Sequence, residues 1–402
     1  MRIKNQIAKL YGLEFFTAFG LAQVVWVALL AQRGFSLAEI GAAEGFFHLV
    51  SFLCEVPSGM AADLLGRRRT LISACFVRAA GAVCMACSVS FAGVLCAMGL
   101  HAFSYNLLSG TREAITYDSL LEAKLENIYE AVAARQSGIY RMTAALCALS
   151  TPLTALMGWR AAYLADGAAA LLAVCCAAFL TEPQLNAPGS VEPDLCFLRR
   201  LSRHFCTSIC FLRRDPLAAC KMLADGATGC CAALGVMLLQ QHMAQLGLGT
   251  GGLGLPLLLI SICGALGAAL APQVYLSYFR AAVLCFFGVG GAIVCAGMPF
   301  LAAAVLGGAA ATFWEGMMEI KTSARLNRDF PSSQRATLVS VQSMCYSVLM
   351  LPVSPVAGAL CQRFGTGAGI TALGLSFGCC ALIGCMLYRR GRKQRGQRGF
   401  LK

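Results

Sequence analysis

The fold is decided by one stretch in the first quarter of the chain, Glu55-Val-Pro57-Ser-Gly59-Met-Ala-Ala-Asp63-Leu-Leu-Gly66-Arg67-Arg68-Arg69. Because it lies between two long apolar runs, it predicts a short polar loop that joins two helices. Gly66 permits a tight turn in this loop, and Gly59 permits a neighbouring helix to approach closely. Asp63 can accept charge-assisted hydrogen bonds from Arg67 or Arg68, or cap the start of a helix.

The composition of the whole chain explains what such a loop would connect. Of the 402 residues, 58% are hydrophobic and only 13% are Asp, Glu, Lys or Arg, whereas soluble proteins carry about 25% charged residues. This excludes a soluble enzyme, a secreted disulfide scaffold and a disordered chain, and it predicts an all-α polytopic membrane protein. A spanning helix needs about 20 apolar residues, and twelve such segments are found, at 10–32, 36–60, 70–90, 92–114, 135–157, 160–181, 217–241, 250–273, 281–298, 299–320, 336–360 and 366–388.

Six of these segments lie on each side of a polar, proline-containing stretch in the middle of the chain. We therefore predict an N-terminal six-helix half at 1–181, a central linker at 182–215, a C-terminal six-helix half at 216–388 and a basic tail at 389–402. Two six-helix halves are an arrangement that secondary transporters build from internal repeats.

The basic residues predict the orientation of the chain in the membrane. The sequence has 32 Lys and Arg against 19 Asp and Glu, a formal net charge of +13. Of the 32, 25 fall in loops on one side, four lie in or at the edge of spans, and three lie on the opposite side, at Arg33, Arg160 and Arg363. Because cytoplasmic loops carry the excess of Lys and Arg, we expect a multi-pass protein of the cytoplasmic (inner) cell membrane with both termini in the cytoplasm. The basic excess is then a topology signal, and we expect no nucleic-acid partner.

The sequence contains no pattern typical of an enzyme site. Its 22 cysteines lie mostly inside apolar runs, where a free cysteine packs as a small hydrophobe. There is no P-loop, no His-Glu-x-x-His and no Gly-x-Ser-x-Gly pattern. We therefore expect no enzyme activity, no cofactor and no metal.

The quoted stretch resembles the signature loop of the major facilitator superfamily, Gly-x-x-x-Asp-x-x-Gly-Arg-Arg, at the five positions Gly59, Asp63, Gly66, Arg67 and Arg68. The resemblance implies the twelve-helix fold of that family, and a role for the loop in bracing the two halves at the cytoplasmic face and gating their movement. Leu64 departs from the pattern, since many members carry a basic residue there. Two further stretches, 109–120 and 327–340, are similar to sequences of bacterial transporters often labelled multidrug-efflux-like.

Charges inside the predicted spans are the candidate functional residues, because an ionisable group at mid-bilayer costs at least ~2.5–3.5 kcal/mol and usually faces a cavity or a partner. Glu44, His48 and Glu55 fall on one helical face and could carry protons, or could instead make helix-packing hydrogen bonds. Arg78 lies near mid-membrane, about 13 Å along its helix from Arg69. The remaining candidates, as substrate contacts, proton carriers or structural ion pairs, are Arg112, Glu113, Arg141, Asp225 and Glu315.

We therefore expect a secondary active transporter that works by alternating access, with proton-coupled efflux of a small amphipathic molecule. Its partners would be that molecule, protons and the lipid bilayer, and we expect a monomer. Two alternatives stay open: an uptake symporter for a nutrient or organic anion, and a non-transporting membrane sensor of the same fold.

Overall fold

The computed structural model describes residues 3–183, 206, 210, 213, 215–329 and 335–380, without the side chains of 56, 63, 130, 327–329 and 335–340. Most of the predicted linker and the whole basic tail thus lie outside the described residues. The described residues form helices and short connections without a β-strand, and nine of these helices are long and apolar enough to cross a membrane. The chain is an all-α, multi-pass membrane protein, as the composition predicts.

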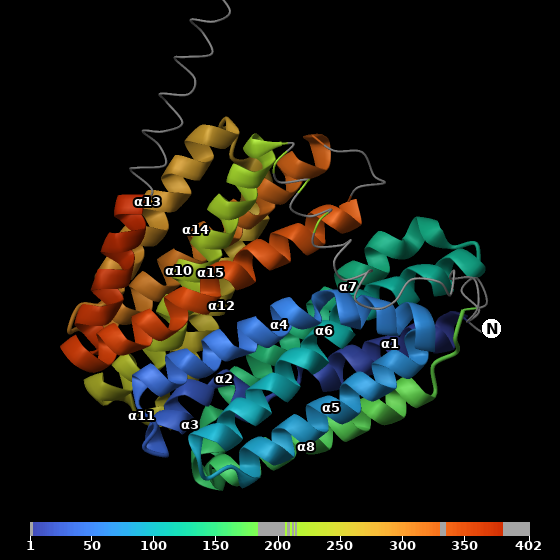
Figure 1. The fold of residues 1–402 in the computed structure, drawn as a ribbon, viewed down its shortest axis with the longest axis horizontal. Coiled ribbons are helices and arrows are strands. Elements are labelled where there is room, and N and C mark those ends of the chain that lie inside the picture. The colour runs from blue at the N-terminus through green and yellow to red at the C-terminus, as the bar shows by residue number, and fades with distance from the viewer. Residues whose placement is uncertain are drawn as a thin grey trace, which may run out of the picture. The chain divides into compact units, whose positions relative to one another are not determined.

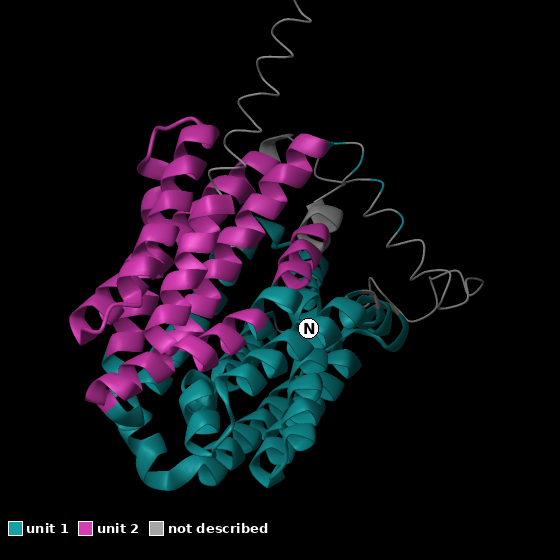
Figure 2. Cartoon of the chain, turned by 60° about the vertical axis from the view of Figure 1, so that its left-hand side comes forward, with its two compact units in different colours: residues 1–215, 249–255, 350–355 teal, residues 216–248, 256–349, 356–402 magenta. Residues whose placement is uncertain are grey.

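The chain divides into two compact units, which Figure 2 distinguishes by colour. Unit 1 comprises residues 1–215, 249–255 and 350–355, and unit 2 comprises residues 216–248, 256–349 and 356–402. The helices that carry unit 1 are α1 (Ile3–Ala18), α2 (Leu21–Val24), α3 (Trp26–Gln32), α4 (Leu37–Leu65), α5 (Arg67–Cys87), α6 (Phe91–Glu122), η1 (Glu126–Ile128), α7 (Tyr129–Leu149), α8 (Thr151–Ala178) and α11 (Gly249–Gly252).

In unit 1, helix α5 packs against both α6 and α8, and these helices run side by side in Figure 1. Buried aliphatic side chains from α1, α5, α6 and α8 form the core at one end of the unit, among them Leu10, Leu71 and Ile115. At the start of α4, Ser36 and Glu39 form a capping box, because the amide of Glu39 donates to the Ser36 Oγ while the Ser36 amide donates to the Glu39 carboxylate. The helix boundaries of unit 1 are therefore set by local sequence as well as by hydrophobicity.

Unit 2 is built around close contacts between helix backbones. Helix α14 packs against α13 and α10. A Cβ added at Gly307 would lie 2.6 Å from the carbonyl oxygen of Ala292, and one at Gly267 would collide with the carbonyl of Phe313. Only glycine permits these approaches, as small residues generally do between helices in membranes. The remaining elements are α10 (Pro216–Met243), η3 (Ala244–Leu248), α12 (Gly254–Leu270), η4 (Ala271–Gln273), α13 (Tyr278–Ala296), α14 (Leu301–Asp329) and α15 (Arg335–Phe364).

Three predicted spans differ from the nine long apolar helices. The segment predicted at 10–32 is broken into α1, α2 and α3. The segment predicted at 135–157 corresponds mainly to α7, which is 21 residues long but is not among the nine, and the last segment is a shorter apolar helix, Thr366–Cys380. The count of twelve spans, like the domain boundaries, therefore stays a prediction.

Candidate functional site

Unit 1 encloses a cavity of about 740 Å³ whose lining combines charged and aromatic side chains. Every helix from α1 to α8 contributes to its wall. Ionisable groups on membrane helices usually face such a cavity or a partner, because a charge in contact with lipid costs free energy. Its charged or ionisable polar lining residues are Glu14, Glu44, Arg78, His101, Arg112, Glu113 and Asp166, and its aromatic ones are Trp26, Phe47, Tyr105, Tyr129, Tyr140 and Tyr163.

Four of the charges predicted from the sequence thus meet at this cavity: Glu44, Arg78, Arg112 and Glu113. Arg78 lies near the middle of α5, where the sequence places it at mid-membrane. Arg141 does not line the cavity, because its position on α7 is exposed on the outside of the unit.

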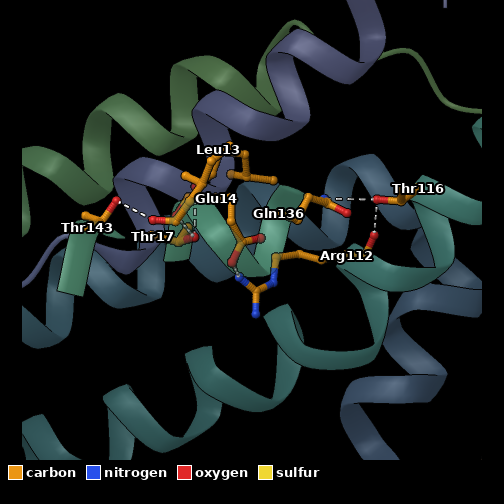
Figure 3. Close-up of polar contacts among 8 residues, drawn as sticks. Leu13, Glu14, Thr17, Arg112, Thr116, Gln136 and Thr143 are labelled. Carbon is orange, nitrogen blue, oxygen red and sulfur yellow. Dashed lines mark hydrogen bonds and ion pairs between the residues drawn. The ribbon is translucent and has the colours of Figure 1, made fainter. Parts of the chain in front are cut away.

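Glu14 and Arg112 form an ion pair inside the cavity wall, with 2.7 Å between the Glu14 Oε1 and the Arg112 Nη1. Figure 3 shows the two side chains meeting between α1 and α6. From Arg112 the polar contacts continue to α7, because the Thr116 hydroxyl donates to the Arg112 carbonyl and the Gln136 side chain donates to Thr116. The network ties α1, α6 and α7 together at the cavity wall.

The helix is interrupted between α1 and α2, and the carboxylate of Asp166 on α8 binds the backbone at this break. The backbone N–H groups of Leu21, Ala22 and Gln23 donate to the Asp166 carboxylate at 2.6, 3.2 and 3.3 Å. A Cβ at Gly20 would lie 2.7 Å from the Cβ of Gln23, so only glycine fits at this break. A carboxylate at a helix N-terminus satisfies its free N–H groups and complements its dipole.

On α4, Glu44 approaches His48 one turn further along, with 3.4 Å between the Glu44 Oε1 and the His48 Nε2. Glu44 lines the cavity, whereas His48 and Glu55 do not. Ser51, on the same helical face, donates to the Asn106 side chain of α6 at 2.8 Å. The stripe of polar residues on α4 therefore serves both the cavity and the contact with α6.

The sequence reasoning did not single out Asp166, His101 and Tyr163, although all three line the cavity. Asp166 and His101 are ionisable residues within apolar helices, so the criterion that selects Arg78 also selects them. Tyr163 has no such signal, because tyrosines are common in the walls of helix bundles.

The stretch predicted as a polar loop is mostly helical, because α4 continues to Leu65 and α5 begins at Arg67, so that Gly66 alone joins the two helices. The motif is held by residues from distant parts of unit 1. Gly66 has a φ of +87°, a conformation that favours glycine. The backbone N–H groups of Arg67 and Arg68, at the start of α5, each donate to the Glu182 carboxylate at 2.7 Å. The Arg67 side chain pairs with Asp118 of α6, and that of Arg68 donates to the carbonyl of Ala178.

At two other positions of the motif, Asp63 and Gly59, the structure does not show the contacts expected from the sequence. The side chain of Asp63 lies outside the described residues. Among the described parts of the chain, no atom lies within 4 Å of a Cβ built at Gly59, so the close helix approach expected there is not seen. Helix α4 packs on α6 through other positions, such as Phe46 against Gly99.

We expect the variant Glu182→Gln to destabilise the protein by about 1 kcal/mol, because an amide leaves one of the two N–H groups without its charged acceptor and removes the negative charge beside the helix start. The measurement is the midpoint of thermal unfolding of detergent-purified protein. Glu126→Gln, which neutralises an exposed carboxylate in η1, serves as the control and should leave the midpoint unchanged. Equal midpoints for both variants would contradict the capping role.

The remaining predicted carboxylates, Asp225 and Glu315, lie in unit 2. Asp225 of α10 accepts a hydrogen bond of 2.6 Å from the Gln342 side chain of α15. Glu315 is half-buried on α14, close to the face of α10 that carries Gly229. Both therefore lie at helix contacts within their own unit. In the described residues of either unit, no group of three His, Cys, Asp or Glu is placed to hold a metal ion.

The fold is similar to that of solved transporter structures. A mutant form of the nucleoside transporter NupG superimposes with a TM-score of 0.78 at 13% identity, covering 97% of this chain and 99% of that one. A POT family transporter in complex with a thioalcohol-conjugated peptide gives a TM-score of 0.72 at 12% identity, covering 96% of each chain. At such low identity the likeness shows the fold alone. A comparison with curated protein sequences finds no match.

The family is shown by the sequence itself. The family model described as Major Facilitator Superfamily matches residues 10–351, a range that includes all of α2 to α14. The match agrees with the loop motif at Gly59–Arg68, with the apolar helices and with the fold of the solved neighbours. The chain therefore belongs to the major facilitator superfamily, a family of membrane transporters and not of enzymes.

Proposed function

We propose that the chain is a secondary active transporter that uses the proton gradient to export a small amphipathic molecule, by alternating access of its two halves. The observation that carries this proposal is the cavity of unit 1, where charged, polar and aromatic side chains from eight helices face one space. A site of about 300–1,000 Å³ with a mainly apolar wall and a few fixed polar groups is typical for small organic ligands.

Proton coupling is supported by carboxylates that face the cavity together with a basic partner. Glu44 lies 3.4 Å from His48, and Glu14 lies 2.7 Å from Arg112. Uptake of a proton by either carboxylate weakens its attraction to the partner, so the proton and the geometry of the cavity wall are linked. Asp225 in unit 2, bound to Gln342, is the corresponding candidate in the other half of the chain.

The membrane placement is also part of the proposal. The ratio of 25 basic residues in loops on one side to three on the other supports cytoplasmic termini in the inner membrane. We propose a monomer as the working unit, since the cavity is built from one chain.

The test begins with a thermal-shift screen of amphipathic solutes on the detergent-solubilised protein at two pH values, because binding raises the unfolding midpoint by mass action. Solutes that bind are then loaded into proteoliposomes with an imposed pH gradient. We expect gradient-driven flux of these solutes in the direction of export. Flux that follows the opposite gradient would make the chain an uptake symporter, and binding without any flux would favour a sensor.

Coupling is tested with Glu44→Gln, which keeps the shape of the side chain but cannot exchange a proton. We expect this variant to lose flux driven by the pH gradient, by at least tenfold, while equilibrium exchange of labelled solute across the vesicle continues. Asp225→Asn is examined in the same way, and Glu126→Gln, an exposed carboxylate outside the cavity, is the matched control. Unchanged gradient-driven flux would remove the substituted residue from the coupling mechanism.

A further inference from the structure

Arg78 is a cation in the cavity wall that forms no ion pair with any described residue. It lies near the middle of α5 and faces the cavity. Within the described part of the chain, its guanidinium takes part in no ion pair and no hydrogen bond, in contrast to Arg112, which is held by Glu14. A guanidinium at this depth costs free energy unless it meets a partner. A molecule bound in the cavity could be that partner.

Three of the four carboxylates that line the same cavity are held by other groups, and the fourth is Glu113 of α6. Glu14 is paired with Arg112, Glu44 lies against His48, and Asp166 accepts three backbone N–H groups of the α1–α2 break. Asp166 lines the same cavity as Arg78, yet among the described residues the two side chains form no ion pair. The positive charge of Arg78 is thus left facing the cavity.

A second observation at the same cavity comes from Tyr163 of α8. This side chain is only 6% exposed and lines the cavity, and its buried hydroxyl has no hydrogen-bond partner among the described residues. A buried hydroxyl without a partner costs free energy in the empty site and gains it when a ligand supplies an acceptor. Tyr163 lies one helical turn before Gly167 on α8, and a Cβ built at Gly167 would lie 3.7 Å from the carbonyl oxygen of Ala79, the residue that follows Arg78 on α5.

Next to Arg78 the wall provides an apolar, aromatic surface. The Phe47 ring of α4 lies with its centroid 5.9 Å from that of His101 and 6.1 Å from that of Tyr105, both on α6. This part of α6 packs on α5 close to Arg78, because a Cβ built at Gly81, one turn after Arg78, would lie 3.6 Å from the backbone nitrogen of His101. Flat rings with a hydrogen-bonding edge are suited to hold the planar body of an organic ligand.

We propose that this cavity binds an amphipathic organic anion, with its carboxylate at Arg78 and Tyr163 and its apolar body against Phe47 and Tyr105. The proposal rests on the proposed function and adds the charge of the transported molecule, whichever direction it moves. A guanidinium presents a planar fork of donors that matches a carboxylate better than a lysine ammonium does. The cavity volume of about 740 Å³ accommodates such a ligand with space for water.

The test uses three compounds that share the indole ring and a short side chain at its 3-position but differ in the charge at the end of that chain: indole-3-acetate (anion), indole-3-acetamide (neutral) and tryptamine (cation). Binding to the detergent-solubilised protein is measured by calorimetric titration at pH 7. We expect indole-3-acetate to bind at least tenfold more tightly than either of the other two. Equal affinity for all three, tighter binding of tryptamine, or no binding of indole-3-acetate would overturn the proposal.

The site is located with Arg78→Gln, which should reduce the affinity for indole-3-acetate at least tenfold and leave that for indole-3-acetamide unchanged. Arg160→Gln is the matched control, because Arg160 is exposed and does not line the cavity. If Arg78→Gln fails to fold, Tyr163→Phe removes only the hydroxyl and should weaken binding of the anion about threefold or more, again without affecting the amide. Affinities unchanged by both substitutions would overturn the assignment to this cavity.

Failure of this inference is distinguishable from failure of the proposed function. Vesicles that transport tryptamine but do not bind indole-3-acetate would show a transporter with a different substrate class. Binding of indole-3-acetate that depends on Arg78, without movement of any solute across the vesicle, would keep the anion site and overturn transport.

Discussion

Replacing Asp166 by Ala is expected to destabilise unit 1 by about 3 kcal/mol or more. Three backbone N–H groups, those of Leu21, Ala22 and Gln23, lose their common acceptor, and each buried donor left without a partner costs about 1–3 kcal/mol. Water in the cavity can reach the N–H of Gln23 most easily, because Gln23 lines the cavity, so the full sum is not expected. Asp166→Asn keeps one acceptor oxygen and should lose less than Asp166→Ala.

Two measurements separate this role from a general loss of stability. The unfolding midpoint in detergent reports the total cost, and hydrogen–deuterium exchange reports the amides of residues 21–23 directly. We expect these amides to exchange at least tenfold faster in Asp166→Ala at a temperature where the protein is still folded. The control Glu126→Gln should change neither readout. A lowered midpoint with unchanged exchange at residues 21–23 would contradict the role of Asp166 as the acceptor for these amides.

The second large effect is expected at the pair of Glu14 and Arg112. Removing one partner of a buried ion pair costs about 3–5 kcal/mol, because the other charge stays behind without compensation. We expect about 2–3 kcal/mol for Glu14→Gln, since the Arg112 side chain retains 25% exposure and the cavity solvates it in part. The variant should unfold at a lower temperature and lose most of its transport activity, because the ion pair that links α1 and α6 at the cavity wall is lost.

The two single variants should differ in a specific way. In Arg112→Gln the remaining carboxyl can take up a proton and become neutral, whereas in Glu14→Gln the remaining guanidinium stays charged. We therefore expect Arg112→Gln to be the less destabilised of the two. The double variant Glu14→Gln/Arg112→Gln should be more stable than Glu14→Gln, as a thermodynamic cycle of the four proteins measures. Additive effects of the two substitutions would contradict a direct pair.

The sequence predicts the class of fold well because hydrophobicity, glycine spacing and loop charge all act locally. The run from Gly59 to Arg68 lies at the junction of α4 and α5, but the predicted loop is reduced to Gly66, because both helices extend into the motif. The turn at Gly66 has the positive φ that glycine permits. The charge of Arg78 at mid-helix likewise predicts a polar space around it. Each of these inferences requires only residues that are close together along the chain.

The partners of the charged groups were not predictable, because they come from distant helices. Glu14 and Arg112 are separated by 98 residues, and Arg67 and Glu182 by 115. One apolar segment at 10–32 also gives no sign of the interruption at Gly20, since the residues on both sides of the break are apolar. The break exists because Asp166 supplies the acceptors that the helix lacks there, and a carboxylate 143–145 residues away cannot be read from the local pattern.

The interruption at Gly20 has a consequence for the order in which the protein is made. A span in lipid must satisfy every backbone N–H internally, yet those of Leu21, Ala22 and Gln23 depend on a carboxylate that lies 143–145 residues later in the chain. During synthesis the first segment therefore enters the membrane before its acceptor has left the ribosome. The first segment reaches its final form only when α8 has been inserted beside it. The break in the first segment and the sixth predicted segment therefore complete their folding together.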